Sequence, residues 1–191
     1  MPAGAVRRRG PRAPVVSHTA VRVPVREAET IVRRRALANG DPLQPQDGSL
    51  MAHITVLSPF VAEDQLDDGV IAELERYFAD EGQFGYELTG VSRFPGEGPA
   101  YLVPEPGSLF RELTQGLCRI FRQFPPYGGR FDDLVPHLSV PLLAGETVDD
   151  LRADVEHRLP LEATAFTATL VRVAEHDTRT IASFPFGSTA A

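Results

Sequence analysis

The alternation of apolar and polar residues divides the chain beyond residue 18 into amphipathic helices and short strands. Apolar positions recur at helical spacing in four segments, namely 27–38, 67–80, 108–123 and 147–159. Alternating or continuous apolar runs that end at turn residues predict strands. These runs cover 20–25, 52–57, 84–94, 100–103, 136–140, 166–173 and 180–186. The pattern therefore predicts an α+β fold with one hairpin in 84–103 and another in 166–186.

The order of these predicted elements repeats itself along the chain. The strands at 52–57 and 136–140 are each preceded by a helix and followed by a helix, a strand, a turn and a strand. Leu66-Asp67-Asp68 recurs as Val148-Asp149-Asp150, 82 residues later. A duplicated unit places its two equivalent strands around a pseudo-two-fold axis. Equivalent side chains on those strands would then face each other across a shared cleft.

Each of the two equivalent strands carries a histidine and, two residues later, a hydroxyl side chain: His53-Ile54-Thr55 and His137-Leu138-Ser139. Because a strand alternates its faces, the histidine and the hydroxyl of each motif point the same way. Two imidazoles can divide the roles of acid and base near neutral pH. Two hydroxyls can hydrogen-bond anionic oxygens. The pair of motifs predicts phosphodiester chemistry that needs no metal.

A single His-x-Thr/Ser tripeptide is a weak pattern, and the chain holds a third copy, His176-Asp177-Thr178. We interpret that copy as surface, because it lies between polar residues in the predicted turn of the last hairpin. For His53 and His137 the alternative is burial in the core with local hydrogen bonds. Their equivalent places in the repeat favour a functional pair. His18 and His157 are predicted at the surface, His18 within an N-terminal tail.

Other polar groups have plainer interpretations. The doublets Asp67-Asp68 and Asp149-Asp150 could ligate a metal, but each lies where a helix begins and favours stabilisation of the helix N-terminus. Asp132-Asp133 precedes the second motif and is expected to hydrogen-bond the local backbone. Cys118 lies beside the apolar face of its helix and is predicted to pack in the core. As the single cysteine, it excludes an internal disulfide and a cysteine-based zinc cluster.

Charge and composition limit the partners and the location. All 19 basic residues are arginines, so no lysine is available as a nucleophile. Residues 1–18 carry four arginines and no acidic residue, so the other residues hold a net charge of −11 within the total of −7. Long nucleic acid binds poorly to so acidic a body, whereas a small phosphate or an RNA end fits a local pocket. No apolar run reaches the roughly 18 residues of a membrane span, and no secretory signal is present, so a cytoplasmic location is expected.

The chain is predicted to form one domain with two lobes over residues 19–187. Residues 1–18 are expected to be a disordered basic tail and residues 188–191 a short C-terminal tail. An RNA-attracting role for the basic tail is the less favoured alternative. A monomer is expected.

The strings at 53–60 and 136–140 resemble the two signatures of the 2H phosphoesterase superfamily, and most closely its branch of bacterial 2′-5′ RNA ligase-like proteins, or RNA 2′,3′-cyclic phosphodiesterases. The resemblance covers roughly residues 19–187. It implies a bilobal, duplicated α+β fold in which two antiparallel sheets enclose a central cleft and helices lie outside. It also implies that His53 is the catalytic acid and His137 the base, with Thr55 and Ser139 as ligands of the phosphate oxygens.

The same resemblance implies the reaction: a 2′,3′-cyclic phosphate, on an RNA terminus or a small cyclic nucleotide, is opened to a 2′-phosphate without a cofactor or a metal. The reverse reaction joins RNA ends through a 2′-5′ linkage. The residues considered for substrate binding are Phe60, Phe94, Tyr101 and Tyr127, which could stack on a base, and Arg93 and Arg130, which could reach a phosphate. For each of them taken alone, a role in packing or at the surface is the favoured alternative. A non-catalytic module that binds RNA ends or nucleotides is the main alternative, and a structural domain with buried histidines is another.

Overall fold

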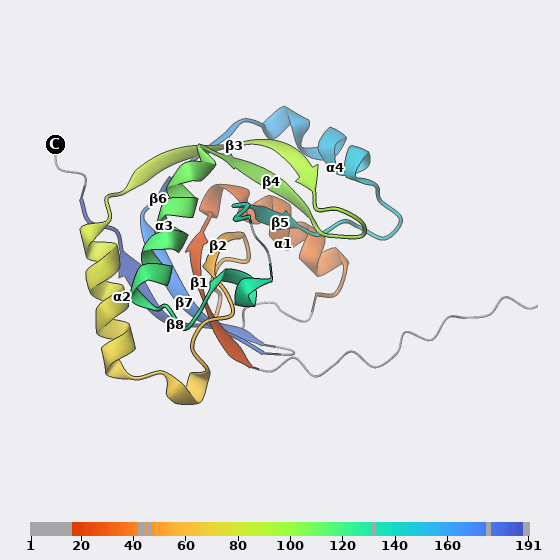
Figure 1. Ribbon diagram of the computed structural model, residues 1–191. Helices are drawn as coiled ribbons and strands as arrows, with labels where there is room; N and C mark the ends of the chain where they lie inside the picture. The colour runs from red at the N-terminus through yellow and green to blue at the C-terminus, as the bar shows by residue number, and fades with distance from the viewer. Residues whose placement is uncertain (1–16, 42–44, 46, 131–132, 175–176, 189–191) are drawn as a thin grey trace, which may run out of the picture.

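The computed structural model describes residues 17–41, 45, 47–130, 133–174 and 177–188 (Figure 1). Within these ranges eight strands form one antiparallel sheet, and four α-helices pack against it. The strands are β1 (His18–Pro24), β2 (His53–Leu57), β3 (Phe84–Arg93), β4 (Ala100–Glu105), β5 (Leu138–Val140), β6 (Leu161–Ala165), β7 (Thr167–Val173) and β8 (Thr178–Pro185). The helices are α1 (Glu29–Ala38), α2 (Asp68–Asp80), α3 (Gly107–Ile120) and α4 (Val148–Val155). Short 3-10 helices lie at η1 (Arg26–Ala28), η2 (Glu63–Gln65), η3 (Pro126–Gly129) and η4 (Glu156–Arg158).

The strand order, β6-β3-β4-β5-β2-β1-β7-β8, shows the expected internal repeat. The unit β1-α1-β2-α2-β3 recurs as β4-α3-β5-α4-β7, with β6 before β7 and β8 after it. The first two strands of each unit pair with each other, and the third strand of each unit pairs with the first strand of the other. The pseudo-two-fold axis therefore passes between β2 and β5, the two strands that carry the histidine motifs.

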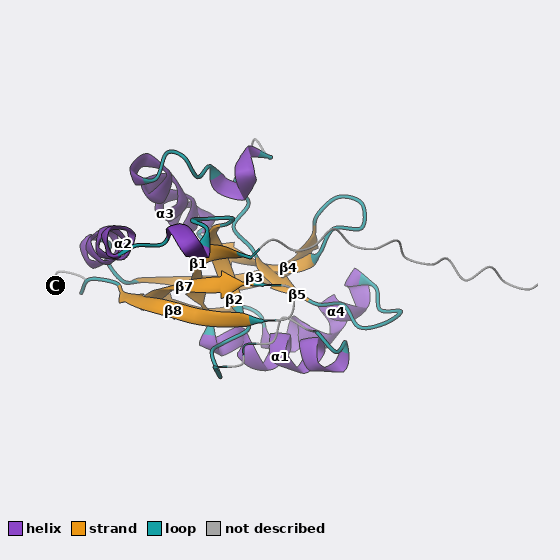
Figure 2. Ribbon diagram, turned by 90° about the horizontal axis from the view of Figure 1, so that it is seen from below, coloured by secondary structure: helices purple, strands orange, loops and turns teal. Residues whose placement is uncertain are grey.

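The α+β class and the duplication are confirmed, and the two expected sheets are the two halves of one curved sheet. The halves are joined by a single residue pair, Ile54 of β2 with Leu138 of β5. In Figure 2, α2 and α3 lie on one side of the sheet, and α1 and α4 lie on the other. The helices α2 and α3 pack against β8 and β2, whereas α1 and α4 pack against β5 and β3. Each pair of helices thus covers a different half.

The core follows the alternation of the strands. In β2 the side chains of Ile54 and Val56 are buried, whereas His53 and Thr55 between them are partly exposed. In β5 Leu138 and Val140 are buried and Ser139 is exposed. In both strands the alternate apolar residues therefore face the core, and the residues of the two motifs lie on the opposite face.

The acidic doublets begin helices as predicted. The side chain of Asp67 accepts a hydrogen bond from the Val70 amide and caps α2. Thr147 and Asp150 form a capping box at the start of α4, in which each side chain bonds the backbone of the other residue. Cys118 is half-buried and packs against the core, as expected. Of the helices in the described residues, none has the length and apolar character that a membrane crossing requires.

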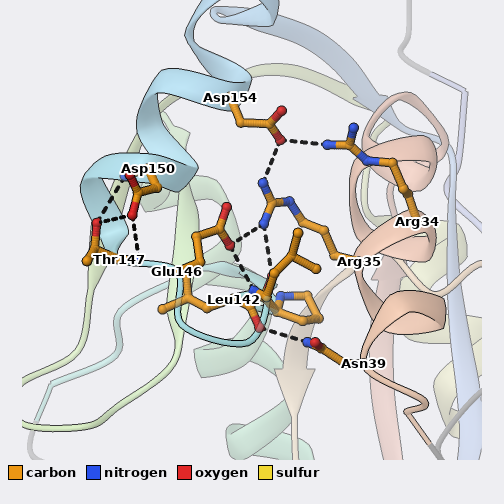
Figure 3. A network of polar contacts seen from close by, with 10 residues as sticks. Arg34, Arg35, Asn39, Leu142, Glu146, Thr147, Asp150 and Asp154 are labelled. Carbon is orange, nitrogen blue, oxygen red and sulfur yellow. Dashed lines mark hydrogen bonds and ion pairs between the residues drawn. The ribbon is translucent and has the colours of Figure 1, made fainter.

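A buried arginine ties α1 to the segment after the second motif (Figure 3). The Arg35 side chain is 1% exposed and pairs with Glu146 and with Asp154, each at 2.5 Å. Its Nη1 also donates to the Pro141 carbonyl oxygen at 3.5 Å. Burial opposes the charge of Arg35, but the two carboxylates outweigh it, so its pKa is raised. This network fixes the chain immediately beyond β5.

The structure differs from the sequence-based expectations at three places. His18 is the first residue of β1, so its placement in the tail is wrong. Strand β6 was not predicted. Its five residues follow a proline, and three of them are alanine or threonine, so they form no clear apolar pattern. The strand of the second motif begins one residue beyond His137 rather than at residue 136. Asp132, His176, residues 1–16 and residues 189–191, which also featured in the predictions, lie outside the described residues.

Candidate active site

The two histidine motifs meet where the halves of the sheet join. Ile54 of β2 pairs with Leu138 of β5, and both side chains are fully buried. Their neighbours along each strand point to the opposite face of the sheet. The antiparallel register places the histidine of each motif opposite the hydroxyl residue of the other. The structure therefore brings together the four predicted residues His53, Thr55, His137 and Ser139.

Both imidazoles are held in the same way. The Nδ1 of His53 bonds the Met51 carbonyl oxygen at 2.6 Å, and the Nδ1 of His137 bonds the Val135 carbonyl oxygen at 2.7 Å. Because a carbonyl oxygen can only accept, Nδ1 carries the proton in each ring. The Nε2 of each neutral ring is then the atom that can take up a proton and release it.

The electrostatic surroundings favour the neutral form of both rings. The pKa of His53 is lowered to about 3, mainly by burial and also by the charges of Arg22 and His137, while the hydrogen bond to Met51 opposes the shift. Burial also lowers the pKa of His137, against the effect of its bond to Val135. A bound anion would reverse these shifts by stabilising the imidazolium forms.

Arg22 is a site residue that the sequence analysis did not identify. It lies in β1 directly opposite Thr55 of β2, between the buried residues Val21 and Val23. Its position on the face that carries the motifs follows from that alternation. The signal was present in the sequence, since a charged residue inside an apolar strand must either find a partner or face a ligand.

A cavity of about 240 Å³ lies beside the first motif, and His53, Ser139 and Arg22 contribute to its lining. A smaller cavity of about 30 Å³ is also lined by His53 and Arg22, together with three threonines of β7 and β8. The segment before β2 closes the larger of these two cavities with Leu50 and Met51. The candidate site is thus a pocket on the β1 side of the histidine pair.

Three aromatic rings surround His137 on the other side. The ring centroid of Phe94 lies 4.8 Å from that of His137 and Tyr101 lies 5.6 Å away, both edge-to-face. Tyr127 stacks on the same imidazole at 6.4 Å. Tyr127 has a φ of 52°, which is rare for a non-glycine residue, and its amide donates to the Ser58 carbonyl oxygen at 2.8 Å. Three of the predicted aromatic candidates, Phe94, Tyr101 and Tyr127, therefore lie at the histidine pair, and of these Tyr101 is buried.

The remaining candidates are not brought to the pair. Phe60 is 4% exposed and packs edge-to-face on Phe121 and Phe124, so the prediction that it stacks on a substrate is wrong. Its apolar ring gains more from the core than from a surface position. Arg93 is exposed, and its Nε donates to the Gly98 carbonyl oxygen within the β3–β4 turn. Arg130 is exposed just after η3.

A larger cavity, of about 730 Å³, lies elsewhere, on the half of the sheet that ends in β6. Four glutamates contribute to its lining: Glu27, Glu87, Glu105 and Glu162. In the sheet register Glu87 lies opposite both Glu105 and Glu162. A surface of this charge repels phosphate groups, so volume alone does not identify the site.

Similarity to known proteins identifies the family. The profile of the 2′-5′ RNA ligase superfamily matches residues 21–177, which includes both histidine motifs. The chain belongs to the 2′-5′ RNA ligase superfamily. The resemblance to 2H phosphoesterases that the two motifs indicated is thereby confirmed at the level of the superfamily. A comparison with curated proteins finds no match.

Solved structures show the fold of this superfamily member. Protein TT0787 of Thermus thermophilus is 17% identical, with a TM-score of 0.56 over 90% of this chain and 99% of that one. LigT of E. coli complexed with 3′-AMP is 11% identical, with a TM-score of 0.55 over 89% and 98% of the two chains. LigT complexed with NADP+ is 16% identical, with a TM-score of 0.53 over 93% and 100%. At these identities the likeness establishes a LigT-like fold.

Proposed function

We propose that this chain opens 2′,3′-cyclic phosphates, on RNA ends or small nucleotides, to 2′-phosphates. Membership of the superfamily already assigns it to proteins of phosphoesterase type. The observation that carries the finer proposal is the β2–β5 register, which sets two imidazoles and two hydroxyls around one axis. Anchoring of both rings through Nδ1 leaves one proton-transfer atom on each, as acid–base catalysis needs.

In the proposed reaction a water molecule attacks phosphorus, and the bond between phosphorus and O3′ breaks. His137 removes a proton from the water through Nε2, and His53 donates a proton from Nε2 to O3′. The products are a 2′-phosphate and a 3′-hydroxyl, and one proton has passed from His53 to the leaving oxygen while His137 has gained one. Each such transfer contributes about 10²–10⁴-fold to the rate.

The hydroxyls of Thr55 and Ser139 are proposed to donate hydrogen bonds to the non-bridging oxygens. Both lie on the same face as the imidazoles, and neither is buried in the core. Negative charge on these oxygens grows towards the transition state, so fixed donors there lower the barrier. In the reverse direction a 5′-hydroxyl would take the place of water and form a 2′-5′ linkage.

A nucleotide substrate is supported by two further observations. LigT of E. coli, a relative in fold, has been crystallised with 3′-AMP and with NADP+. In this chain the partly exposed rings of Phe94 and Tyr127 lie beside His137, where a base could stack, and the buried ring of Tyr101 packs against Phe94 and His137. The cytoplasmic location, the monomeric state and the independence from metal stay predictions.

The test is a panel of 2′,3′-cyclic nucleotides and RNA ends carrying cyclic phosphates, assayed in EDTA with the position of the product phosphate determined. Turnover to 2′-phosphates is expected, with loss of at least about 100-fold in kcat/KM for His53→Ala and for His137→Ala. His157→Ala is the matched control, because His157 is exposed on η4. Binding without turnover would instead identify a non-catalytic module, and full activity of either site variant would refute the proposed roles.

A further inference from the structure

Arg22 occupies a position that no structural role explains. Its neighbours Val21 and Val23 point into the core, and Arg22 lies between Thr55 of β2 and Thr169 of β7 on the face that carries the motifs. The Thr169 hydroxyl donates to the main-chain carbonyl oxygen of Arg22 at 3.4 Å, which fixes the backbone and not the guanidinium. The Arg22 side chain therefore lies beside the first motif and takes no part in the hydrogen bonds that hold the strands together.

The Nε atom of Arg22 is buried and has no hydrogen-bond partner among the described residues, although the side chain as a whole is partly exposed. No carboxylate among the described residues forms an ion pair with Arg22. Burial lowers its pKa to about 10, so the group is still a cation at neutral pH. A largely desolvated cation that lacks a partner destabilises the fold. A ligand that supplies a negative charge would remove that cost.

The space beside Arg22 is where such a ligand would bind. Both cavities that His53 lines are also lined by Arg22. The charge of Arg22 reaches His53 strongly enough to lower the pKa of that imidazole. Arg22 and the proton-transfer group of the first motif therefore face one volume.

The repeat shows that Arg22 also breaks the symmetry of the site. Arg22 lies opposite the hydroxyl residue Thr55 of the first motif, and Tyr101 of β4 lies opposite Ser139 of the second. These are equivalent positions under the pseudo-two-fold axis. One side of the site therefore carries a cation where the other carries an aromatic ring, which itself contacts Phe94 at 4.6 Å.

We propose that Arg22 binds a non-bridging oxygen of the substrate phosphate and, together with Tyr101, sets the orientation of the substrate across the pseudo-symmetric site. The phosphate oxygens point towards β1, and the nucleoside points towards the rings of Phe94, Tyr101 and Tyr127. This inference rests on the proposed function. A cyclic phosphodiester carries one negative charge, which matches the single guanidinium.

The experiment measures thermal stability with and without inorganic phosphate, and kcat/KM for a 2′,3′-cyclic nucleotide, in the full chain and in three variants. Arg22→Met removes the charge and keeps an apolar stem, and Arg22→Lys restores a charge without the planar fork. Arg76→Met is the control, because Arg76 is exposed on α2 and pairs only with Glu73 among the described residues.

For Arg22→Met we expect an unchanged or higher melting temperature, loss of stabilisation by phosphate, and a fall in kcat/KM of about 100-fold or more. Arg22→Lys should recover part of both effects, and Arg76→Met should behave as the unmodified chain. A variant Arg22→Met that melts lower but turns over normally, or that phosphate still stabilises fully, would overturn the inference.

The proposed reaction and the proposed role of Arg22 can be refuted independently of each other. If the unmodified chain turns over no cyclic phosphate but its stabilisation by phosphate depends on Arg22, the proposed reaction is wrong and the anion site stands. If turnover depends on His53 but not on Arg22, the reaction stands and the role of Arg22 is wrong.

Discussion

Arg35 is buried and Arg22 is partly exposed, and the Nε atom of each is buried, but the two differ in their partners. Arg35 of α1 holds two carboxylates, Glu146 and Asp154, through its terminal nitrogens. Arg22 of β1 has no such partner among the described residues, and its charge acts on the neutral ring of His53. The Nε atom of each arginine lacks a hydrogen bond, so the difference lies in the carboxylates.

The comparison separates a structural charge from one that is available to a ligand. A buried ion pair is stable only while both partners are present, so removing one of them is costly. A buried cation without a partner destabilises the fold, so its removal is neutral or favourable. Removing Arg35 should therefore lower stability and largely keep activity, whereas removing Arg22 should keep stability and lower activity.

The largest expected effect is at Arg35. Arg35→Met should lower the free energy of unfolding by about 3–5 kcal/mol, because it leaves the mostly buried carboxylate of Glu146 without its arginine and leaves Asp154 only the exposed Arg34. Urea denaturation measures the change, and kcat/KM per folded molecule should stay within a few-fold. Arg34→Met is the matched control on the same helix, since Arg34 is exposed and shares Asp154, and it should cost less than about 1 kcal/mol. Equal losses in the two variants would remove the contrast between paired and unpaired arginines.

The second effect is a dependence of stability on pH. The pKa of folded His53 is about 3, below the ordinary value, so between about pH 6.5 and pH 3 the unfolded chain binds more protons. Stability should fall by about 2 kcal/mol as the pH falls through this window, because His53 is partly exposed and the full shift is not realised. Denaturation of His53→Gln across the same window should show a smaller slope. Arg22→Met should also flatten it, since one cause of the low pKa is gone, and an unchanged slope would show that Arg22 does not act on His53.

The third effect concerns the hydroxyls on the two sides of the site. Thr55→Val and Ser139→Ala should each lower kcat/KM by about 10-fold, because one hydrogen bond to a phosphate oxygen is lost. Steady-state kinetics of each variant, with circular dichroism to confirm folding, measures this. Thr55 lies opposite Arg22, so the double variant with Arg22→Met should lose less than the sum of the separate effects. Full additivity would argue that the two groups do not hold the same phosphate.

The smallest effect is expected on the aromatic side. Tyr127→Phe should change KM less than about two-fold, because the ring that stacks on His137 is kept. Tyr127→Gly removes the ring and relieves the positive φ, so stability should be kept while KM for a nucleotide rises several-fold. Binding of inorganic phosphate, which has no base, should be unaffected in both variants. A loss of phosphate binding in Tyr127→Gly would contradict the assignment of the phosphate to the β1 side and of the nucleoside to the aromatic side.

Much of the site could be predicted because its signals are local. The spacing of two residues between His53 and Thr55 places them on one face of any strand, whatever the fold around it. Asp67, Thr147 and Asp150 begin helices through contacts within four residues. The repeat in the element order was also visible along the chain and was confirmed by the strand order.

Other features depended on contacts between distant segments. Phe60 follows the first motif directly, but the approach of Phe121 and Phe124 buries it. Strand β6 is weakly patterned and forms because the edge of β3 offers a partner. The role of Arg22 could not be inferred from its place in an apolar strand. The sequence does not show whether a carboxylate pairs with it, as two carboxylates pair with Arg35.

The sequence by itself therefore determined which groups this protein can use: two imidazoles, two hydroxyls and their equivalent places in a duplicated unit. Strand periodicity is a property of neighbouring residues, so it needs no knowledge of the fold. Only the tertiary structure decided that Ile54 pairs with Leu138. That pair in turn determines which hydroxyl lies opposite each histidine. It also decided which arginine finds carboxylates and which is left beside His53, because ion pairing joins residues more than a hundred positions apart.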